Sequence, residues 1–221
     1  LFRSFSNQRY NHSFIDFFGM EADTYDFIKE DSQDSQYNPS DDDLLMLVEK
    51  ELEKGNRKQF IVLHTYGSHF NYRERYPETA AFFLPDFPVD AEVKYKDNLM
   101  NAYDNSIAYT DQFLARTIQW LQGRAATGQP TAMMYISDHG ESLGEDGLYL
   151  HGMPYLIAPE VQKKVPWITW LSPEFLQNRG IRMDCLQQQK DRAITHDYLF
   201  HSVLGMLGVK TAVYRSDQDL F

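Results

Sequence analysis

Carboxylates and imidazoles gather in one short block of the sequence. Asp138 and His139 are adjacent, Gly140 follows, and Glu141 comes next, all directly after the apolar run 131–137. Such oxygen and nitrogen donors are ligands that zinc or manganese takes in proteins. A glycine lets the backbone turn sharply enough for the donors to converge. The block therefore predicts a metal site, against the plainer interpretation of a turn in which Asp138 caps a helix and His139 is merely exposed.

Two further histidines follow the ends of predicted elements. His69 lies just beyond the apolar run 60–63, and His151 lies in a Gly-containing turn. Ligand sites in open α/β sheets lie beyond the carboxyl ends of the strands. We therefore expect His69 to reach the Asp138 block if the strands 60–63 and 131–137 are neighbours. A lone loop histidine is more often a surface residue, so the case for a functional site depends on several of them converging.

The remaining candidate histidines suit structural roles better. His64 lies within an apolar run, which favours a buried, hydrogen-bonded histidine. His196 follows Thr195, which is placed to cap the last helix, so capping is preferred over a role of His196 as a further metal ligand.

Strands and helices alternate along the chain, which is typical of a mostly parallel sheet with helices on its faces. The sequence predicts strands at 60–63, 131–137 and 165–171 and helices from Asp41 to about Gly55, from Lys96 to Gln122, and after Thr195. The acidic stretch 31–43 is interpreted as a solvated surface, and 68–92 as a long functional loop. Together these elements predict an α/β fold.

Composition excludes several classes of protein. The 21 Lys+Arg against 32 Asp+Glu give a net charge of −11, which leaves no excess of cations for a nucleic acid. The single Cys185 permits neither an internal disulfide nor a zinc site of several thiolates. The sequence contains no apolar run long enough to span a membrane, no glycine-rich nucleotide motif and no Gly-x-Ser-x-Gly elbow.

The block Ser137–Glu145, with Tyr149–Tyr155 soon after, resembles the signature of the bacterial phosphoethanolamine transferases. These lipid A-modifying enzymes, which include the mobile colistin-resistance transferases, belong to the alkaline phosphatase and sulfatase superfamily. Further matching pieces are Leu63–His69, Asn101–Asn105 and Thr195–Asp197. The resemblance covers most of the chain from about Gln59 to the end. It implies an alkaline phosphatase/sulfatase-like fold, with a mostly parallel central sheet and helices on both faces.

The resemblance also implies a reaction. In this family a Thr activated by Zn²⁺ attacks the phosphorus of phosphatidylethanolamine, and the phosphoethanolamine-enzyme then passes its group to lipid A or a related glycolipid. By matching motif, Asp138 and His139 would be ligands of the principal zinc. His69, Glu141 and His151 would be the catalytic residues of the adjoining site. They would contact the substrate phosphate, protonate the leaving oxygen or hold a second zinc.

Substrate binding is assigned by the same resemblance to His69, His151 and Asn7, since Asn7 matches a short Asn-containing segment that contacts substrate in the family. After His69, a Gly-Pro pair common in the family is replaced by Phe70-Asn71, which leaves the specificity for the acceptor open.

Other family features are expected to lie upstream of the matched segments. These are the nucleophilic Thr and one further zinc-binding Glu. Thr24 and Thr65 are poor candidates for the nucleophile, because neither stands in the sequence context that the family has around it. We therefore expect residues 1–221 to be a single domain, the later portion of a sulfatase-like catalytic domain. It would be truncated at its N-terminal side, without the nucleophile segment and the transmembrane region, and inactive by itself. The whole enzyme would reside in the bacterial inner membrane with its catalytic domain facing the periplasm.

Two alternatives stay open. Within the superfamily, the protein could be another phosphodiesterase, a sulfatase or a glycerol-phosphate transferase. In a different class, it could be a non-catalytic interaction domain that keeps the fold and binds no metal.

Overall fold

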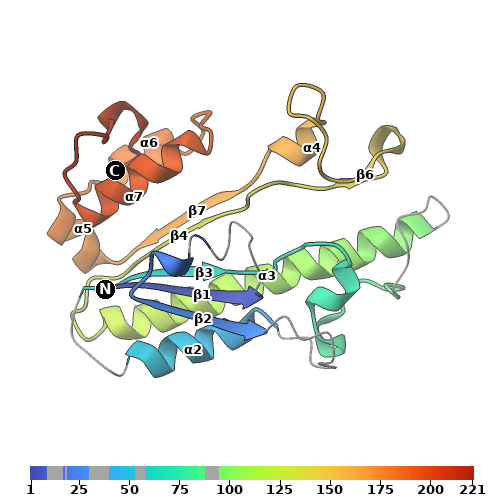
Figure 1. Cartoon of the computed structure of the whole chain (residues 1–221), viewed down its shortest axis with the longest axis horizontal. Coiled ribbons are helices and arrows are strands. Elements are labelled where there is room, and N and C mark those ends of the chain that lie inside the picture. The colour runs from blue at the N-terminus through green and yellow to red at the C-terminus, as the bar shows by residue number, and fades with distance from the viewer. Residues whose placement is uncertain (9–16, 18, 30–39, 53–57, 88–94) are drawn as a thin grey trace. The chain divides into compact units, whose positions relative to one another are not determined.

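The computed structural model describes residues 1–8, 17, 19–29, 40–52, 58–87 and 95–221 (Figure 1). The chain divides into two compact units. The first comprises Leu1–Thr117 and Ser137–Val165, and the second comprises Ile118–Ile136 and Pro166–Phe221. Every site residue predicted from the sequence belongs to the first unit.

The first unit is built on a three-stranded parallel sheet. Its strands are β1 (Phe2–Gln8), β2 (Thr24–Lys29) and β3 (Phe60–His64), in the order β2-β1-β3. The pairing places Ser6 beside His64 at the carboxyl end of the sheet. The strand expected at 60–63 is confirmed. β1 was not predicted, because this central strand buries Arg3 and Ser4 together with Phe5 and so shows no apolar run.

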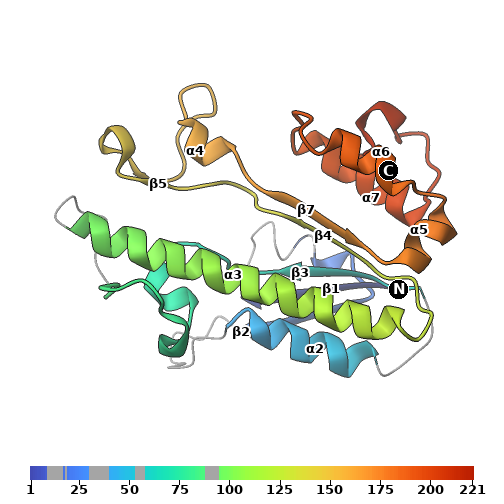
Figure 2. The same cartoon turned by 180° about the vertical axis from the view of Figure 1, so that it is seen from behind.

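Two helices accompany the sheet, α2 (Asp42–Leu52) and α3 (Lys96–Ala125), which lie side by side in Figures 1 and 2. Leu44 and Val48 of α2 are buried, and α2 contacts β1. The Tyr109 hydroxyl of α3 donates to Asp42 Oδ2 over 2.7 Å. Burial, together with this hydrogen bond, raises the pKa of Tyr109 to about 12. Both helices were predicted.

Asn105 of α3 fixes the segment that follows the 3₁₀ helices η1 (Tyr72–Arg75) and η2 (Glu78–Ala80). The Asn105 side chain is fully buried. Its Oδ1 accepts from the backbone N–H groups of Phe82 and Phe83 over 2.8 and 2.9 Å, and its Nδ2 donates to the Phe83 carbonyl over 2.9 Å. The predicted loop 68–92 is therefore closely tied to α3 as far as residue 87, and its last residues, 88–92, lie outside the described residues.

A small β-hairpin directly follows the predicted metal-binding residues 138–141. Its strands β5 (Ser142–Leu143) and β6 (Tyr149–Leu150) are antiparallel, η4 (Glu145–Gly147) joins them, and the short helix α4 (Glu160–Lys163) follows. The buried Gln162 side chain donates to Ser142 Oγ and to the Leu150 carbonyl, while the Gln162 carbonyl accepts from Gly140 N. A Cβ on Gly140 would meet the Val161 carbonyl oxygen at 2.0 Å. Only glycine therefore permits this close approach to α4.

The second unit contains β4 (Ala132–Ile136) and β7 (Trp167–Leu171), with α5 (Pro173–Arg179), α6 (Met183–Gln189), α7 (Asp197–Leu207) and η5 (Ser216–Gln218). Both strands were expected, but they pair antiparallel, with Met134 opposite Thr169. The Thr195 hydroxyl accepts from Asp197 N, as expected of a residue that caps α7.

Among the described residues, none of the helices combines the length and the apolar character that crossing a membrane requires. The predicted fold class, α/β with a parallel sheet and helices, is confirmed.

Candidate metal centre and active site

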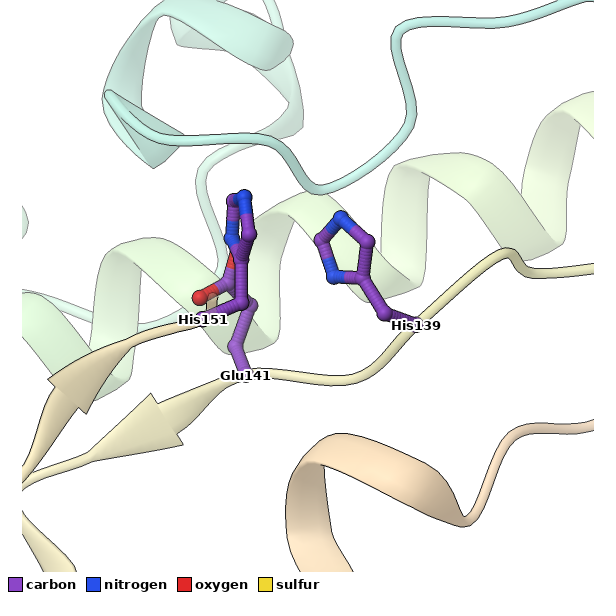
Figure 3. Close-up of side chains that lie close together, drawn as sticks. All are labelled: His139, Glu141 and His151. Carbon is purple, nitrogen blue, oxygen red and sulfur yellow. The ribbon is translucent and has the colours of Figure 1, made fainter. Parts of the chain in front are cut away.

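His139, Glu141 and His151 converge at the β5–β6 hairpin (Figure 3). His139 and Glu141 precede β5, and His151 directly follows β6. One ligand atom from each side chain lies within 4.8 Å of the others. The imidazole rings of His139 and His151 have centroids 3.9 Å apart. The antiparallel hairpin thus brings His151 to Glu141 and His139, which lie ten and twelve positions earlier in the sequence.

Glu141 fixes the orientation and the proton of His151. The Glu141 side chain is only 4% exposed, and its Oε1 lies 2.8 Å from His151 Nδ1. A carboxylate can only accept in such a bond, so Nδ1 carries the hydrogen. In the neutral ring, Nε2 then keeps a lone pair for a metal or a substrate proton.

The second oxygen of Glu141 faces a residue that the sequence analysis did not single out, Tyr72. Glu141 Oε2 and the Tyr72 hydroxyl are both buried without a hydrogen-bond partner among the described residues. Burial raises the pKa of Tyr72, and the neighbouring Glu141 carboxylate raises it further. Tyr72 lies in a cluster with Leu99 and Ala102 of α3, where one aromatic residue among many gives no sequence signal of a functional place.

Asp138 lies at the open side of the cluster. Its side chain is 88% exposed, and Asp138 Oδ2 is 3.7 Å from His139 Nε2. His139 Nδ1 is 3.0 Å from the Gly140 carbonyl oxygen, which can only accept, so Nδ1 donates. The lone pair of neutral His139 is therefore on Nε2, toward Asp138. The pair presents an oxygen and a nitrogen donor side by side, and the role of the two residues as zinc ligands stays a prediction.

His69 approaches the cluster from the segment after β3. Its ring centroid is 5.8 Å from that of His151 and 5.3 Å from that of Tyr66. His69 Nδ1 lies 2.6 Å from the Phe70 carbonyl oxygen and donates to it. The structure thus brings His69, His139 and His151 together, while His196 belongs to the second unit.

Asn7 is buried at the end of β1, where its Nδ2 donates to Asp41 Oδ1 over 2.6 Å. Asp41 also accepts from the backbone N–H groups of Tyr66 and Gly67, over 2.8 and 2.9 Å. The interpretation of Asp41 as solvated is wrong, because three N–H donors satisfy its carboxylate in a buried place. Residues 31–39 of the same predicted surface lie outside the described residues. Asn7 thus contacts Asp41, which binds the backbone just before His69. The role of Asn7 in substrate binding stays a prediction.

His64 makes a hydrogen bond as predicted, but it is half-buried rather than buried. Its Nδ1 is 2.9 Å from Ser6 Oγ. Burial lowers the pKa of His64, and this effect exceeds the opposing attraction of Asp138 and Asp41.

Comparison with known proteins finds similarity to phosphoethanolamine transferases. Phosphoethanolamine transferase EptA of Escherichia coli K12 is 40% identical over 163 residues, a match that covers 72% of this chain and 30% of the relative. Kdo(2)-lipid A phosphoethanolamine 7''-transferase of the same strain is 35% identical over 175 residues, covering 76% and 30%. Among solved structures, the soluble domain of lipooligosaccharide phosphoethanolamine transferase A from Neisseria meningitidis superposes with a TM-score of 0.84 at 31% identity. That superposition covers 100% of this chain and 66% of the other.

The chain spans about 30% of the length of these curated relatives. The sequence profile of the sulfatase family matches residues 2–209, which is nearly the whole chain. The hairpin with its histidines, the parallel sheet and this match lead to one conclusion: the chain belongs to the sulfatase family.

Proposed function

We propose that this chain carries part of the active site of a zinc-dependent enzyme that transfers phosphoethanolamine from phosphatidylethanolamine to lipid A or another envelope glycolipid. One observation carries the proposal. His139, Glu141 and His151 converge within 4.8 Å in a chain whose relatives are named phosphoethanolamine transferases. The names of those relatives, one with lipid A and another with lipooligosaccharide, support a glycolipid acceptor.

The donor atoms suit zinc. Imidazole nitrogens and a carboxylate oxygen are ligands that zinc takes, and Glu141 Oε2 is a buried oxygen beside Tyr72 that meets no geometric hydrogen-bond criterion within the part of the chain that the structure describes. In the proposal Asp138 and His139 hold the principal ion, next to Glu141 and His151. Zinc bound there offsets negative charge on the phosphoryl oxygens and lowers the pKa of the attacking hydroxyl.

The protein side chains move and hold protons. His151 takes up on Nε2 the proton that the attacking Thr hydroxyl loses, and the buried Glu141 carboxylate beside Nδ1 stabilises the resulting imidazolium. His151 then gives this proton to the oxygen that leaves phosphorus. In its protonated form His69 donates its Nε2–H to a phosphoryl oxygen, since its Nδ1–H is already committed to the Phe70 carbonyl. Asn7 contributes its buried Oδ1 to the binding of the substrate.

The remaining parts of the machinery are proposed to precede this chain in a longer protein. They are the nucleophilic Thr, which forms the covalent phosphoethanolamine intermediate, a further zinc-binding Glu, and a membrane-spanning region. Residues 1–221 would then be the later portion of one catalytic domain. The enzyme would lie in the bacterial inner membrane and face the periplasm.

The metal content of the purified chain tests the proposal. We expect about one zinc per chain, lost in both Asp138→Ala and His139→Ala and retained in Asp111→Ala, which removes an exposed carboxylate from α3. Inductively coupled plasma mass spectrometry gives the readout. Zinc that persists in both site variants would place the metal elsewhere, and a form extended upstream that still holds no zinc would contradict the proposal.

A further inference from the structure

The loop between β6 and α4 exposes consecutive large apolar side chains. Tyr155, Leu156 and Ile157 are 75%, 95% and 64% exposed, and Met153 is exposed as well. We call residues 153–157 the apolar tip. In both Figures 1 and 2 the chain between β6 and α4 stands out as an open loop. Single exposed apolar residues are ordinary, whereas such a run marks a surface that contacts something apolar.

Short connections join the apolar tip to the site. It begins two residues after His151, and at its other end Gln162 ties α4 to the β5–β6 hairpin. Within the turn, the backbone N–H groups of Ile157 and Ala158 both donate to the Pro154 carbonyl over 2.9 Å. These backbone groups already have partners inside the protein, so moving the apolar tip into an apolar medium leaves them satisfied.

Cationic side chains border the apolar tip. Lys163 Nζ lies 5.4 Å from the centre of the Tyr155 ring, and Lys164 has a side chain that is 81% exposed. Glu160 pairs with Lys163 over 2.9 Å and with Lys164 over 4.0 Å, so one carboxylate offsets part of the charge of the two lysines. Tyrosine and lysine beside leucine and isoleucine are the side chains that lie at the boundary between water and lipid. In a chain with a net charge of −11, this is a local surface that complements anionic headgroups.

We propose that the apolar tip inserts into the surface of a bilayer that contains anionic lipid and thereby presents lipid headgroups to His151. The inference rests on the proposed function, because a phosphorus atom bonded to diacylglycerol can reach His151 only if the protein surface beside His151 meets the lipid. Leu156 and Ile157 enter the region of the upper acyl chains, while Lys163 and Lys164 remain at the level of the phosphates.

Vesicle binding by the purified chain tests the inference. Vesicles of phosphatidylethanolamine and phosphatidylglycerol are sedimented with wild type, Leu156→Glu and Met46→Glu. Met46 is an exposed apolar residue on α2, so both variants make the same change of charge and polarity. Leu156 makes almost no contact in the folded chain, and its substitution leaves folding intact. We expect Leu156→Glu to weaken binding about tenfold or more and Met46→Glu to bind as wild type does.

A second variant tests the cationic border. Lys164→Gln is expected to weaken binding to vesicles with phosphatidylglycerol and to leave binding to vesicles of phosphatidylcholine alone unchanged. Absence of wild-type binding, or equal effects of Leu156→Glu and Met46→Glu, would overturn the inference. Because zinc content is measured separately, a chain that holds zinc and ignores vesicles refutes only the apolar tip, and a chain that binds vesicles without zinc refutes only the proposed function.

Discussion

At the scale of single residues, the three clustered histidines share one arrangement. Nδ1 of His69 and of His139 donates to the carbonyl of the next residue, and Nδ1 of His151 donates to Glu141. Each neutral ring therefore keeps its lone pair on Nε2. Local hydrogen bonds thus set the tautomers that metal binding and proton transfer need.

Residue types and spacing were enough to single out the donors, but not their supports. Asp138, His139 and Glu141 are polar residues directly after an apolar run, a pattern that can be recognised without a structure. Tyr72 lies beside Glu141, and Asp41 binds the backbone just before His69. Tyr72 was not singled out, because a buried tyrosine resembles any core aromatic residue. Asp41 likewise resembles any acid in the first turn of a helix, and its three partners come from residues 7, 66 and 67. Only the tertiary fold reveals such partners.

His64 gives a prediction about pH. Its lowered pKa means that the unfolded imidazole takes up a proton near its usual value of 6.5 while the folded one does not. Between these two pKa values the unfolded state binds more protons, so the free energy of unfolding falls as the pH falls below 6.5. In the presence of a chelator, urea titrations between neutral and mildly acidic pH should show a smaller loss for His64→Gln than for wild type. Equal losses would refute the assignment of this effect to His64.

At the scale of elements, the sequence predicted those with a strong apolar period or run, β3, β4, β7, α2, α3 and α7. It did not predict β1 and β2, since the central strand of the parallel sheet buries Ser and Arg side chains that carry no strand signal. That β7 runs antiparallel to β4 was also not predicted, because the direction of a strand depends on the path of the chain between the two strands. The sequence also could not predict how near the carboxyl end of β3 lies to the β5–β6 hairpin, because that distance depends on tertiary packing.

The motif Asn101–Asn105 gives a prediction about stability. Asn105→Ala removes the partners of two backbone N–H groups and one carbonyl, which should lower the free energy of unfolding by about 2–4 kcal/mol. Asn101→Ala, in the same helix, removes one exposed hydrogen bond to the Pro85 carbonyl and should cost less than about 1 kcal/mol. Urea unfolding measures both. Similar losses in the two variants would show that the buried network contributes little.

At the scale of the whole molecule, membership of the sulfatase family and the cluster of donors at the hairpin both support the proposed metal-dependent transfer. The net charge of −11 gives no general attraction to an anionic membrane. Under the proposal, contact with lipid therefore comes from local features, and the apolar tip with its two lysines is such a feature, next to His151.

The most direct test of the central claim is headgroup transfer by the protein in its longest natural form. That protein is produced in a bacterium whose lipid A carries no phosphoethanolamine, and the extracted lipid A is analysed by mass spectrometry. The account predicts lipid A or a related glycolipid carrying phosphoethanolamine with wild type and with Asp111→Ala, and none with Asp138→Ala or His151→Ala. Unmodified glycolipid with wild type, or full modification by both site variants, would contradict it.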